Sequence, residues 1–520
     1  MQIRDPREHT PDESRLAFSL RYALGGLVAS SILALGAVGA GWLPIDTIAS
    51  VPILDTLRTS GVGQLVSRSA VIIGGALLLQ AWLVIGADVM NGHIRSIRRL
   101  WLILALWTAP LVLAPPLFSR DVYSYWFQGK LVLAGQDPYT QGVASIPGWF
   151  QNGVDPLWQD TPAPYGPFWL ALSRGVAALA GDNAYLAVLA FRFLALVGVA
   201  LLAYYVPRLA FHCGIDGGKA LWLGVMNPLV LMHFVAGVHN DALMIGLLVA
   251  GAVYALEGRG ALGIALVTMG GMVKPIGLLA VPFVGLMWAG TVQTWRSRAL
   301  AWTKSAAVSV VTYVVVALAV GSSLGWLRAL TTPGEVWTWL SPATALGLAT
   351  GNLLSWIGLG DHHSVTVGVF RAIGMVIAVV IVARLLLKPQ GRTAVRSMML
   401  AFLAVVALGP VVQPWYLLWV LPLAAASGLS PRELRVVLFL VAGFTLYGIW
   451  ETSASADSLL DLSDGLAMFA AAVAVVFAVA VSPRERQLLV GGQVAHGLVP
   501  DDAPAAARGA RLVVRSPETA

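Results

Sequence analysis

The sequence carries very little charge for its length. Only 11% of its 520 residues are Asp, Glu, Lys or Arg, whereas 58% are hydrophobic and the mean hydropathy is +0.78. A soluble domain carries about 25% charged residues. This chain cannot cover a water-facing surface, so its composition excludes a soluble globular enzyme and predicts a protein that crosses the membrane several times.

Cysteine and the common metal or nucleotide motifs are missing as well. The single cysteine, Cys213, excludes a disulfide framework and a cysteine-based metal site. His362 and His363 are adjacent, unlike the i, i+4 pair of a metal hydrolase. No cofactor is expected, and a divalent metal is compatible with the sequence but not indicated by it. The absence of a GxxxxGK[ST] loop argues against an ATP-driven pump.

Apolar segments of membrane-spanning length recur along the chain. We expect an all-α fold with about 13–14 transmembrane helices. The expected spans are 22–42, 69–89, 100–117, 185–207, 219–236, 240–256, 261–274, 276–290, 302–321, 367–387, 395–409, 413–429, 434–451 and 463–481. Two shorter segments rich in Gly or Pro, 166–180 and 342–358, are expected to be re-entrant or interfacial helices on the outer side.

These spans predict one transmembrane domain between two polar ends. Residues 1–21 precede a segment of spanning length, so we expect a cytoplasmic segment and not a cleaved signal peptide. The domain itself covers 22–481, and its outer loops 118–184 and 321–366 carry short helices. Residues 482–520 are rich in Ala, Gly, Arg and Pro and are expected to form a disordered cytoplasmic tail.

The basic residues predict one orientation for the domain. With the N-terminus inside, the inner segments hold 23 of the 33 Lys and Arg but 11 of the 26 Asp and Glu, whereas the outer segments hold 6 and 14. Cytoplasmic loops carry an excess of Lys and Arg, so this orientation is favoured. The net charge of +7 is spread over many short loops, and therefore no nucleic-acid partner is expected.

The loop 118–165 is then outside, and it is dense in aromatic side chains. Ten of its 48 residues are Phe, Tyr or Trp, many of them in "LFSRDVYSYWFQGKLVLAGQDPY" (117–139). One interpretation is an aromatic belt at the membrane interface. The other is a surface on which the rings stack against sugar C–H faces. The sequence leaves the division between these two roles open.

Asp121 is the outer carboxylate best suited to chemistry. It follows an apolar run and adjoins Arg120, so partial burial would raise its pKa while a cation keeps it ionised, as a general base requires. The alternative is an interfacial salt bridge or a helix cap. Asp137 lies in "GQDPYT" and is expected to form a turn before Pro138. Asp155 and Asp160 are expected to be solvated.

Several cations lie inside the expected spans. Arg192, Lys274 and Arg371 fall in the outer half, where an ionisable residue indicates a functional site by default. Lys274 precedes a proline in "GMVKPIG", which predicts a broken helix of the kind that lines binding sites. Three such cations suit a phosphate headgroup. Contact with bilayer lipid headgroups or helix pairing is the alternative for each.

Two further polar clusters open apolar segments near the outer surface. "FVAGVHNDALM" (234–244) holds His239, Asn240 and Asp241, which we interpret either as part of a site or as a tight solvated turn with a helix cap. "VVQPWYLLWVLP" (411–422) holds Gln413, Trp415 and Tyr416, which are either site residues or an aromatic belt.

Together these motifs carry a family resemblance. "SRDVYSYWFQGKLVLAGQDPY", "TPAPYGPFWL", "GVHNDALM", "MVKPIG" and "QPWYLLW" resemble the actinobacterial polyprenol-phosphomannose-dependent α-1,6-mannosyltransferases of lipomannan and lipoarabinomannan core synthesis, with the B type favoured. The resemblance implies a GT-C glycosyltransferase fold in the plasma membrane, with a catalytic Asp in an early outer loop. Asp121 matches that position. In many GT-C enzymes this loop follows the first span, whereas Asp121 follows the third expected span.

The resemblance also implies a reaction on the extracytoplasmic face. The donor is a polyprenol phosphate mannose, the acceptor is a lipid-linked α-1,6-mannan, and Asp121 deprotonates the acceptor hydroxyl in an inverting transfer. No nucleotide-sugar site is required. The residues expected to bind these substrates are Arg120, Tyr123, Tyr125, Asp137, Tyr139, Tyr165, Arg192, His239, Asn240, Asp241, Lys274, Arg371, Gln413, Trp415 and Tyr416.

Two other functions compete with this one. A secondary transporter or lipid flippase would share the intramembrane cations and broken helices, but it predicts inverted repeats, and no convincing repeat is present. It also leaves the aromatic outer loop unexplained. A GT-C enzyme for another lipid-linked sugar, such as arabinofuranose, is poorly distinguished by sequence.

Overall fold

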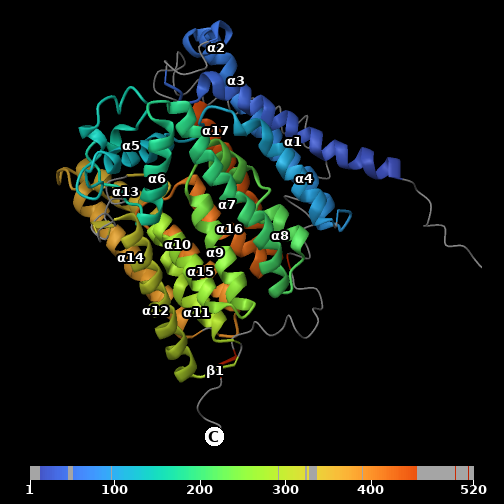
Figure 1. Ribbon diagram of the computed structural model, residues 1–520, viewed down its shortest axis with the longest axis vertical. Coiled ribbons are helices and arrows are strands. Elements are labelled where there is room, and N and C mark those ends of the chain that lie inside the picture. The colour runs from blue at the N-terminus through green and yellow to red at the C-terminus, as the bar shows by residue number, and fades with distance from the viewer. Residues whose placement is uncertain are drawn as a thin grey trace, which may run out of the picture.

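The computed structural model describes most of the chain as one helical assembly (Figure 1). The described residues are 12–44, 51–94, 96–290, 292–321, 325–326, 337–388, 390–453, 498 and 513–514. The span expected at 463–481 and nearly all of the tail expected to be disordered lie outside them.

The predicted all-helical fold is confirmed. In the described ranges, strand pairing is limited to the two-residue strands β1 (Val292–Gln293) and β2 (Val513–Val514), which run parallel. The long helices are α1 (Asp12–Ala40), α3 (Gly61–Met90), α7 (Ala184–His212), α12 (Trp295–Val320), α14 (His363–Leu387) and α17 (Pro431–Ser453). The shorter ones are α2 (Pro52–Thr59), α4 (Ile97–Thr108), α5 (Asp121–Leu133), α6 (Pro167–Ala180), α8 (Gly217–Gly224), α9 (Asp241–Leu256), α10 (Gly260–Val273), α11 (Val281–Trp288), α13 (Pro342–Trp356), α15 (Ala394–Leu408) and α16 (Leu417–Ser427). The 3-10 helices are η1 (Ala109–Val112), η2 (Val143–Ser145), η3 (Pro156–Trp158), η5 (Pro275–Ala280) and η7 (Pro414–Tyr416), and η4 (Val230–Ala236) is a π-helix.

The helices fit a protein with several membrane crossings, although many are short. Six described helices are long and apolar enough to cross a membrane, and a seventh span results if η4 and α9, bent by 112°, count as one. Other expected spans fall on apolar helices of 10–17 residues. The reason is local, because Pro275 ends α10 and separates it from α11 through η5. The two segments expected to be re-entrant or interfacial are the single helices α6 and α13.

The centre of the molecule is the segment 220–253, in which every residue is buried. It holds the end of α8, the π-helix η4 and most of α9. Gly198 of α7 lets this centre pack closely, because a Cβ there would lie 2.2 Å from the carbonyl carbon of Ala242. The glycine therefore fixes α7 against the N-terminal turn of α9, which begins at Asp241.

The loops rich in Lys and Arg gather at one end of the bundle. Arg208 near the end of α7 pairs with Glu257 at the end of α9, at 2.6 Å. Arg298 near the start of α12 donates to the carbonyl of Leu387 at the end of α14, at 3.3 Å. The N-terminus of α9 and the C-terminus of α10 consequently lie toward the opposite end.

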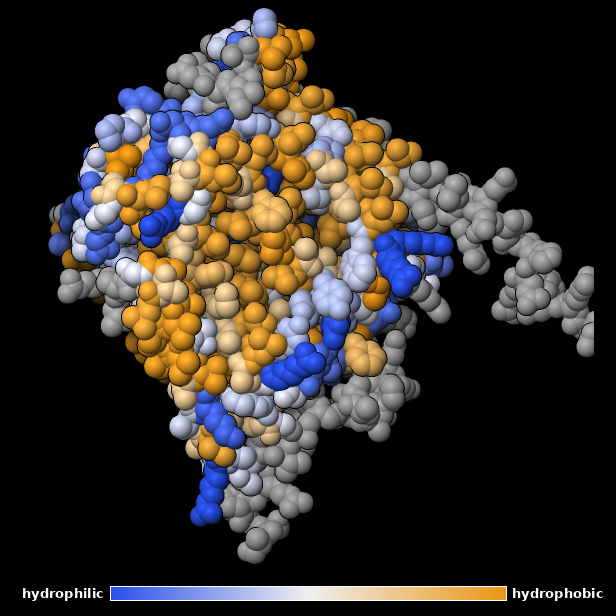
Figure 2. All heavy atoms as spheres, in the orientation of Figure 1, coloured by the Kyte–Doolittle hydropathy of each residue, from blue (hydrophilic) through white to orange (hydrophobic). Residues whose placement is uncertain are grey.

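The surface agrees with this division into two ends. Figure 2 shows a broad apolar band between polar regions at two ends of the molecule. In Figure 1, α5, α6 and α13 lie together at the upper left, whereas β1 lies at the bottom. The motifs singled out in the sequence therefore gather toward the end that carries α5.

Candidate active site

The His239–Asn240–Asp241 segment is buried and not exposed at the surface. His239 and Asp241 are 0% exposed and Asn240 is 1% exposed. The interpretation of this segment as a solvated turn is therefore wrong, because the bundle closes over it. Val238, directly before it, has a φ of 57°, a left-handed conformation that strains a β-branched residue. Such strain persists where the surrounding packing enforces it, and it is common at functional sites.

Asp241 is held by two donors from distant segments. Lys274 Nζ donates to Asp241 Oδ1 at 2.8 Å, and Trp419 Nε1 donates to the same oxygen at 2.6 Å. The other carboxylate oxygen, Oδ2, has no hydrogen-bond partner in the part of the chain that the structure describes. The "MVKPIG" motif predicted a broken helix, and the break between α10 and η5 places Lys274 beside the N-terminus of α9.

Lys274 retains capacity to bind a ligand. Its side chain is 17% exposed, and its ammonium lies 5.2 Å from the ring centroids of both Tyr416 and Trp419. These two rings stack on each other at 3.9 Å. An ammonium has three N–H donors, and Asp241 takes one of them. The remaining donors can serve an anionic group.

Asp121 lies at the first position of α5 and faces this cluster. Its side chain is 22% exposed, Trp158 Nε1 donates to its Oδ1 at 3.4 Å, and His239 Nε2 lies 4.0 Å from its Oδ2. Burial raises the pKa of Asp121, while His239, Lys274 and the Trp158 hydrogen bond oppose the rise. The carboxylate therefore combines partial access with an environment that favours uptake of a proton, as a general base requires.

The hydrogen bond of His239 to the backbone fixes its tautomer. Nδ1 lies 2.7 Å from the carbonyl oxygen of His233, which can only accept, so Nδ1 carries the hydrogen. Nε2 then presents its lone pair toward Asp121 when the ring is neutral. The ring packs on Trp415, with centroids 4.1 Å apart. His239 is thus positioned to accept a hydrogen bond from a hydroxyl placed between it and Asp121.

Three further residues of the cluster were missed in the sequence analysis. His233 is 1% exposed, and both of its ring nitrogens lack a partner among the described residues. Its ring lies near Phe118, His239 and Trp415, at 5.6, 5.9 and 5.6 Å. Because it is ionisable within an apolar run, the rule that selected Lys274 would have found it. Trp158 and Trp419 gave no comparable signal.

Other predicted site residues hold the outer loop in place. Arg120 donates to the carbonyls of Gly153 at 2.8 Å and Val154 at 3.0 Å and lies 4.3 Å above Trp42, and burial lowers its pKa. Tyr123 is buried and donates to the carbonyl of Trp42.

The turn predicted around Asp137 is present. Asp137 is exposed, and its carboxylate accepts the backbone N–H of Tyr139 at 2.9 Å. Arg120, Tyr123, Asp137 and Tyr139 therefore shape the loop that carries Asp121, and the structure shows none of them in contact with Lys274 or Asp241.

Two of the three predicted membrane cations hydrogen-bond to groups other than Asp241. Arg192 is 0% exposed and donates to the carbonyls of Val112 at 2.8 Å, Val235 at 3.0 Å and Ala236 at 3.4 Å. These bonds tie α7 to the ends of η1 and η4. Arg371 on α14 donates to the hydroxyl of Thr344 at 2.9 Å. Lys274 is the predicted membrane cation that pairs with Asp241.

The aromatic rings of the outer loop form a buried layer beside Asp121. Tyr125 meets Tyr165 edge-on at 5.3 Å and Trp169 at 5.1 Å, and all three are buried. Gly166 lets this layer pack against α10, because a Cβ there would lie 2.5 Å from the carbonyl oxygen of Met272.

Two predicted amide side chains remain. The side-chain amide of Asn240 has no hydrogen-bond partner within the described ranges. Gln413 directly precedes η7, which begins with Pro414 and Trp415.

The cluster thus offers a base, a cation and aromatic faces. Within the described ranges, no group of three His, Cys, Asp or Glu side chains could hold a metal ion. The chemistry that these residues support is proton removal from a hydroxyl next to a bound anion.

Comparisons with known proteins agree on one family. Residues 23–290 match a family model described as alpha-(1->6)-mannopyranosyltransferase, N-terminal domain, and residues 343–481 match the MptB C-terminal domain. The chain is 36% identical to a probable alpha-(1->6)-mannopyranosyltransferase of Mycolicibacterium smegmatis, over 91% of this chain and 90% of the relative. It is 34% identical to an alpha-(1->6)-mannopyranosyltransferase of Mycobacterium tuberculosis, over 89% and 87%. It is also 30% identical to alpha-(1->6)-mannopyranosyltransferase B of Corynebacterium glutamicum, over 80% and 75%. No solved structure matches.

Proposed function

The chain belongs to the alpha-(1->6)-mannopyranosyltransferase family, and from this premise we propose that it transfers mannose from polyprenol phosphate mannose to a lipid-linked α-1,6-mannan. Membership of the family supports mannosyl transfer. The resemblance to polyprenol-phosphomannose-dependent enzymes supports the lipid-linked donor. The observation that carries the proposal is that one buried segment, His239–Asp241, lies against both Asp121 and Lys274: His239 is 4.0 Å from Asp121, and Asp241 is 2.8 Å from Lys274. This places a base and an anion-binding cation around one space.

The proposed step is a single displacement with inversion. Asp121 accepts the proton of the acceptor 6-hydroxyl while its oxygen forms a bond to C1 of the mannose. The bond from C1 to the phosphate oxygen breaks, and the lipid phosphate leaves with the electron pair. A β-linked donor thereby gives an α-linked product. Lys274 stabilises the charge on the departing phosphate, and solvent takes the proton from Asp121 afterwards.

The remaining cluster residues bind and orient the two sugars. His239 and Asn240 offer unpaired polar atoms to sugar hydroxyls or to the phosphate. Trp415 supplies an aromatic face, and the buried Tyr125 and Tyr165 support the site from behind. Gln413 and Tyr416 lie next to Trp415 in the chain and contribute to the same binding surface. Arg371 contacts a part of the donor lipid or of the acceptor that lies further from the reacting groups. No metal step is required.

We place this reaction at the extracytoplasmic face of the plasma membrane, in lipomannan core synthesis. The loops rich in Lys and Arg lie at the end of the bundle opposite to the cluster. Cytoplasmic loops carry the excess of Lys and Arg, so the end with the cluster faces outward. An outward-facing site also agrees with the GT-C fold that the family resemblance implies, in which the catalytic Asp lies in an outer loop.

Transfer assays test the proposal directly. Membranes that contain the protein, given radiolabelled polyprenol phosphate mannose and a short α-1,6-mannoside, are expected to elongate the acceptor by an α-linked mannose. Polyprenol phosphate arabinose is expected to give no product. Transfer from the arabinose donor alone would contradict the sugar assignment. Movement of the mannosyl lipid across the bilayer without any transfer would favour the flippase.

The pH dependence of transfer tests Asp121 as the base. Because burial raises the pKa of Asp121, kcat/KM is expected to rise with pH through a pKa above that of a free Asp side chain. The groups that face it are Trp158, His239, Lys274 and Asp241. Replacing Trp158 by Phe removes a hydrogen bond that lowers this pKa, so the acidic limb of the profile should move to higher pH. A profile unchanged in Trp158→Phe would argue against Asp121 as the titrating group.

A further inference from the structure

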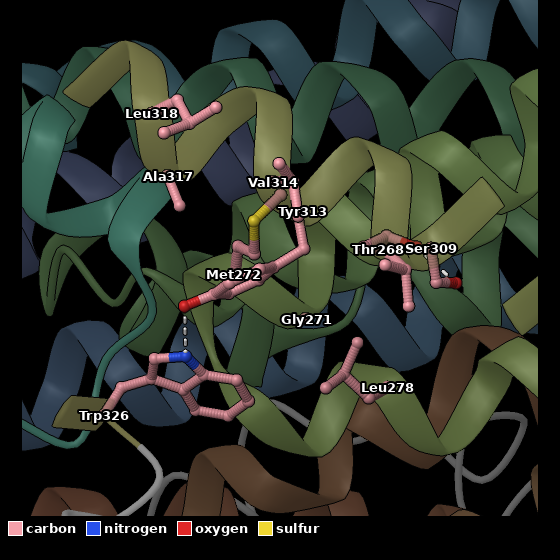
Figure 3. A pocket seen from close by; sticks show the side chains of 11 residues that line it. Thr268, Gly271, Met272, Leu278, Ser309, Tyr313, Val314, Ala317, Leu318 and Trp326 are labelled. Carbon is pink, nitrogen blue, oxygen red and sulfur yellow. Dashed lines mark hydrogen bonds between the residues drawn. The ribbon is translucent and has the colours of Figure 1, made fainter. Parts of the chain in front are cut away.

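An apolar groove runs between α10 and α12, on the side of the α10–η5 break that carries Met272 and Leu278 (Figure 3). Its volume is about 530 Å³, within the range of about 300–1,000 Å³ that small-molecule sites occupy. Thr268 and Met272 line it from α10, and Val314 and Ala317 line it from α12. It is separate from the polar cluster but shares the α10–η5 break with it.

The polar atoms in the groove are bonded to each other. The hydroxyls of Thr268 and Ser309 lie 2.9 Å apart and join α10 to α12. Trp326 Nε1 donates to the hydroxyl of Tyr313 at 2.8 Å, as Figure 3 shows. The lining therefore presents mainly hydrocarbon and ring faces. A polar ligand would gain little from such a surface, whereas a hydrocarbon chain would gain from every buried CH2.

The outer rim of the groove is also apolar. Val310, Val314 and Leu318 line it and are 61%, 45% and 78% exposed. They belong to α12, one of the helices long and apolar enough to cross a membrane. In a bilayer this rim meets lipid hydrocarbon, so a chain can pass between membrane and groove without crossing water.

The groove lies next to the cation of the site. Lys274 falls between two lining residues, Met272 and Leu278, and it is two positions from Met272, or about 7 Å of extended chain. One side of the α10–η5 break therefore offers an ammonium and the other side an apolar channel. This complements an amphiphile with an anionic head and a hydrocarbon tail.

We propose that this groove binds the phosphate-proximal isoprene units of the donor lipid, with its phosphate at Lys274. The inference rests on the proposed function and adds the path of the lipid chain. A phospholipid acyl chain is the competing occupant. The Lys274 ammonium on the other side of the α10–η5 break favours a ligand whose phosphate enters the site, as that of the donor must and that of a structural lipid need not.

A matched pair of α12 variants tests the groove. Ala317 lines it, whereas Ala319, two residues further along α12, is exposed and does not. Ala317→Trp is expected to lower kcat/KM for the long-chain donor by about tenfold, because it displaces a few buried CH2 groups. Transfer from a donor truncated to one isoprene unit should be unchanged. Ala319→Trp should leave both donors unaffected.

The outcomes separate this inference from the proposed function. Equal losses with the long and short donors in Ala317→Trp would overturn the groove while leaving mannosyl transfer intact. Absence of transfer from either donor in the wild-type protein would contradict the proposed function itself.

Photo-crosslinking of the wild-type protein tests the groove without relying on a variant that folds. Polyprenyl phosphate with a diazirine on its second isoprene unit is expected to label peptides of α10 or α12, and unlabelled polyprenyl phosphate should suppress that labelling. Labelling confined to other helices would overturn the inference. So would a diazirine phospholipid that labels α10 and α12 and resists displacement.

Discussion

Replacing Asp121 by Asn is expected to lower kcat for mannosyl transfer by about 10²–10⁴-fold, the range attributed to a positioned general base. The amide keeps the size of the carboxylate and can still accept the hydrogen bond from Trp158, but it cannot take the acceptor proton. Because burial raises the pKa of Asp121, the fold penalises the charge of this carboxylate, and a neutral amide avoids that penalty. The variant should therefore fold normally, which thermal unfolding in detergent can check.

Asp137→Asn is the matched control for this result. Asp137 lies in the same loop but is exposed, and its side chain closes a turn that Asn also forms. We expect Asp137→Asn to transfer mannose at close to the wild-type rate. Full activity in Asp121→Asn, or an equal loss in both variants, would contradict the assignment of Asp121 as the base.

Replacing Lys274 by Met is expected to destabilise the protein by about 3–5 kcal/mol and to abolish transfer, because removing one partner of a buried ion pair leaves a buried charge uncompensated. Asp241 is 0% exposed, and Trp419 would be its one remaining donor in the described structure. Loss of the ammonium also removes the proposed partner of the lipid phosphate. Denaturant unfolding measures the first effect and the transfer assay measures the second.

A double variant separates the two effects of this change. Lys274→Met combined with Asp241→Asn removes both charges, so most of the lost stability should return. Activity should not return if Lys274 binds the phosphate. Recovery of transfer in the double variant would show that Lys274 acts only by neutralising Asp241.

Lys130→Met is the control for the loss of a charge. Lys130 is also 17% exposed and also pairs with an Asp at 2.8 Å, but its partner Asp182 is fully exposed. Exposed pairs contribute about 0–1 kcal/mol, so this variant should remain stable and active.

The polar motifs of the site could be predicted because a charge inside an apolar run is costly and therefore conspicuous. Lys274 stood out for this reason, whereas Asp121 and Asp241 stood out as carboxylates at the ends of apolar runs. The structure brings all three together although they are up to 153 positions apart. His233 obeyed the same rule and was overlooked. Arg192 is also a charge inside an apolar run, but its guanidinium donates hydrogen bonds to three backbone carbonyls.

Other features depended on contacts between distant segments. The role of Trp419 follows from a bond to a carboxylate 178 positions away, and that of Trp158 from one 37 positions away. Tryptophans are common near membrane interfaces, so their presence in the sequence did not distinguish these two. The number of full-length spans was equally hidden, since apolar segments of similar composition became long helices such as α12 or broken ones such as α10 and η5.

The sequence by itself determined that this protein is an all-helical membrane protein, because a chain with so few charged residues requires a bilayer. It also determined the mannopyranosyltransferase family, because each family motif is a short continuous stretch of sequence. Only the tertiary structure decided that the His239–Asp241 segment is buried, that Lys274 pairs with Asp241, and that an apolar groove lies at the α10–η5 break. Burial and pairing depend on which helices pack together. In this fold that packing is set by close approaches such as that of Gly198 to Ala242, which no local pattern reveals.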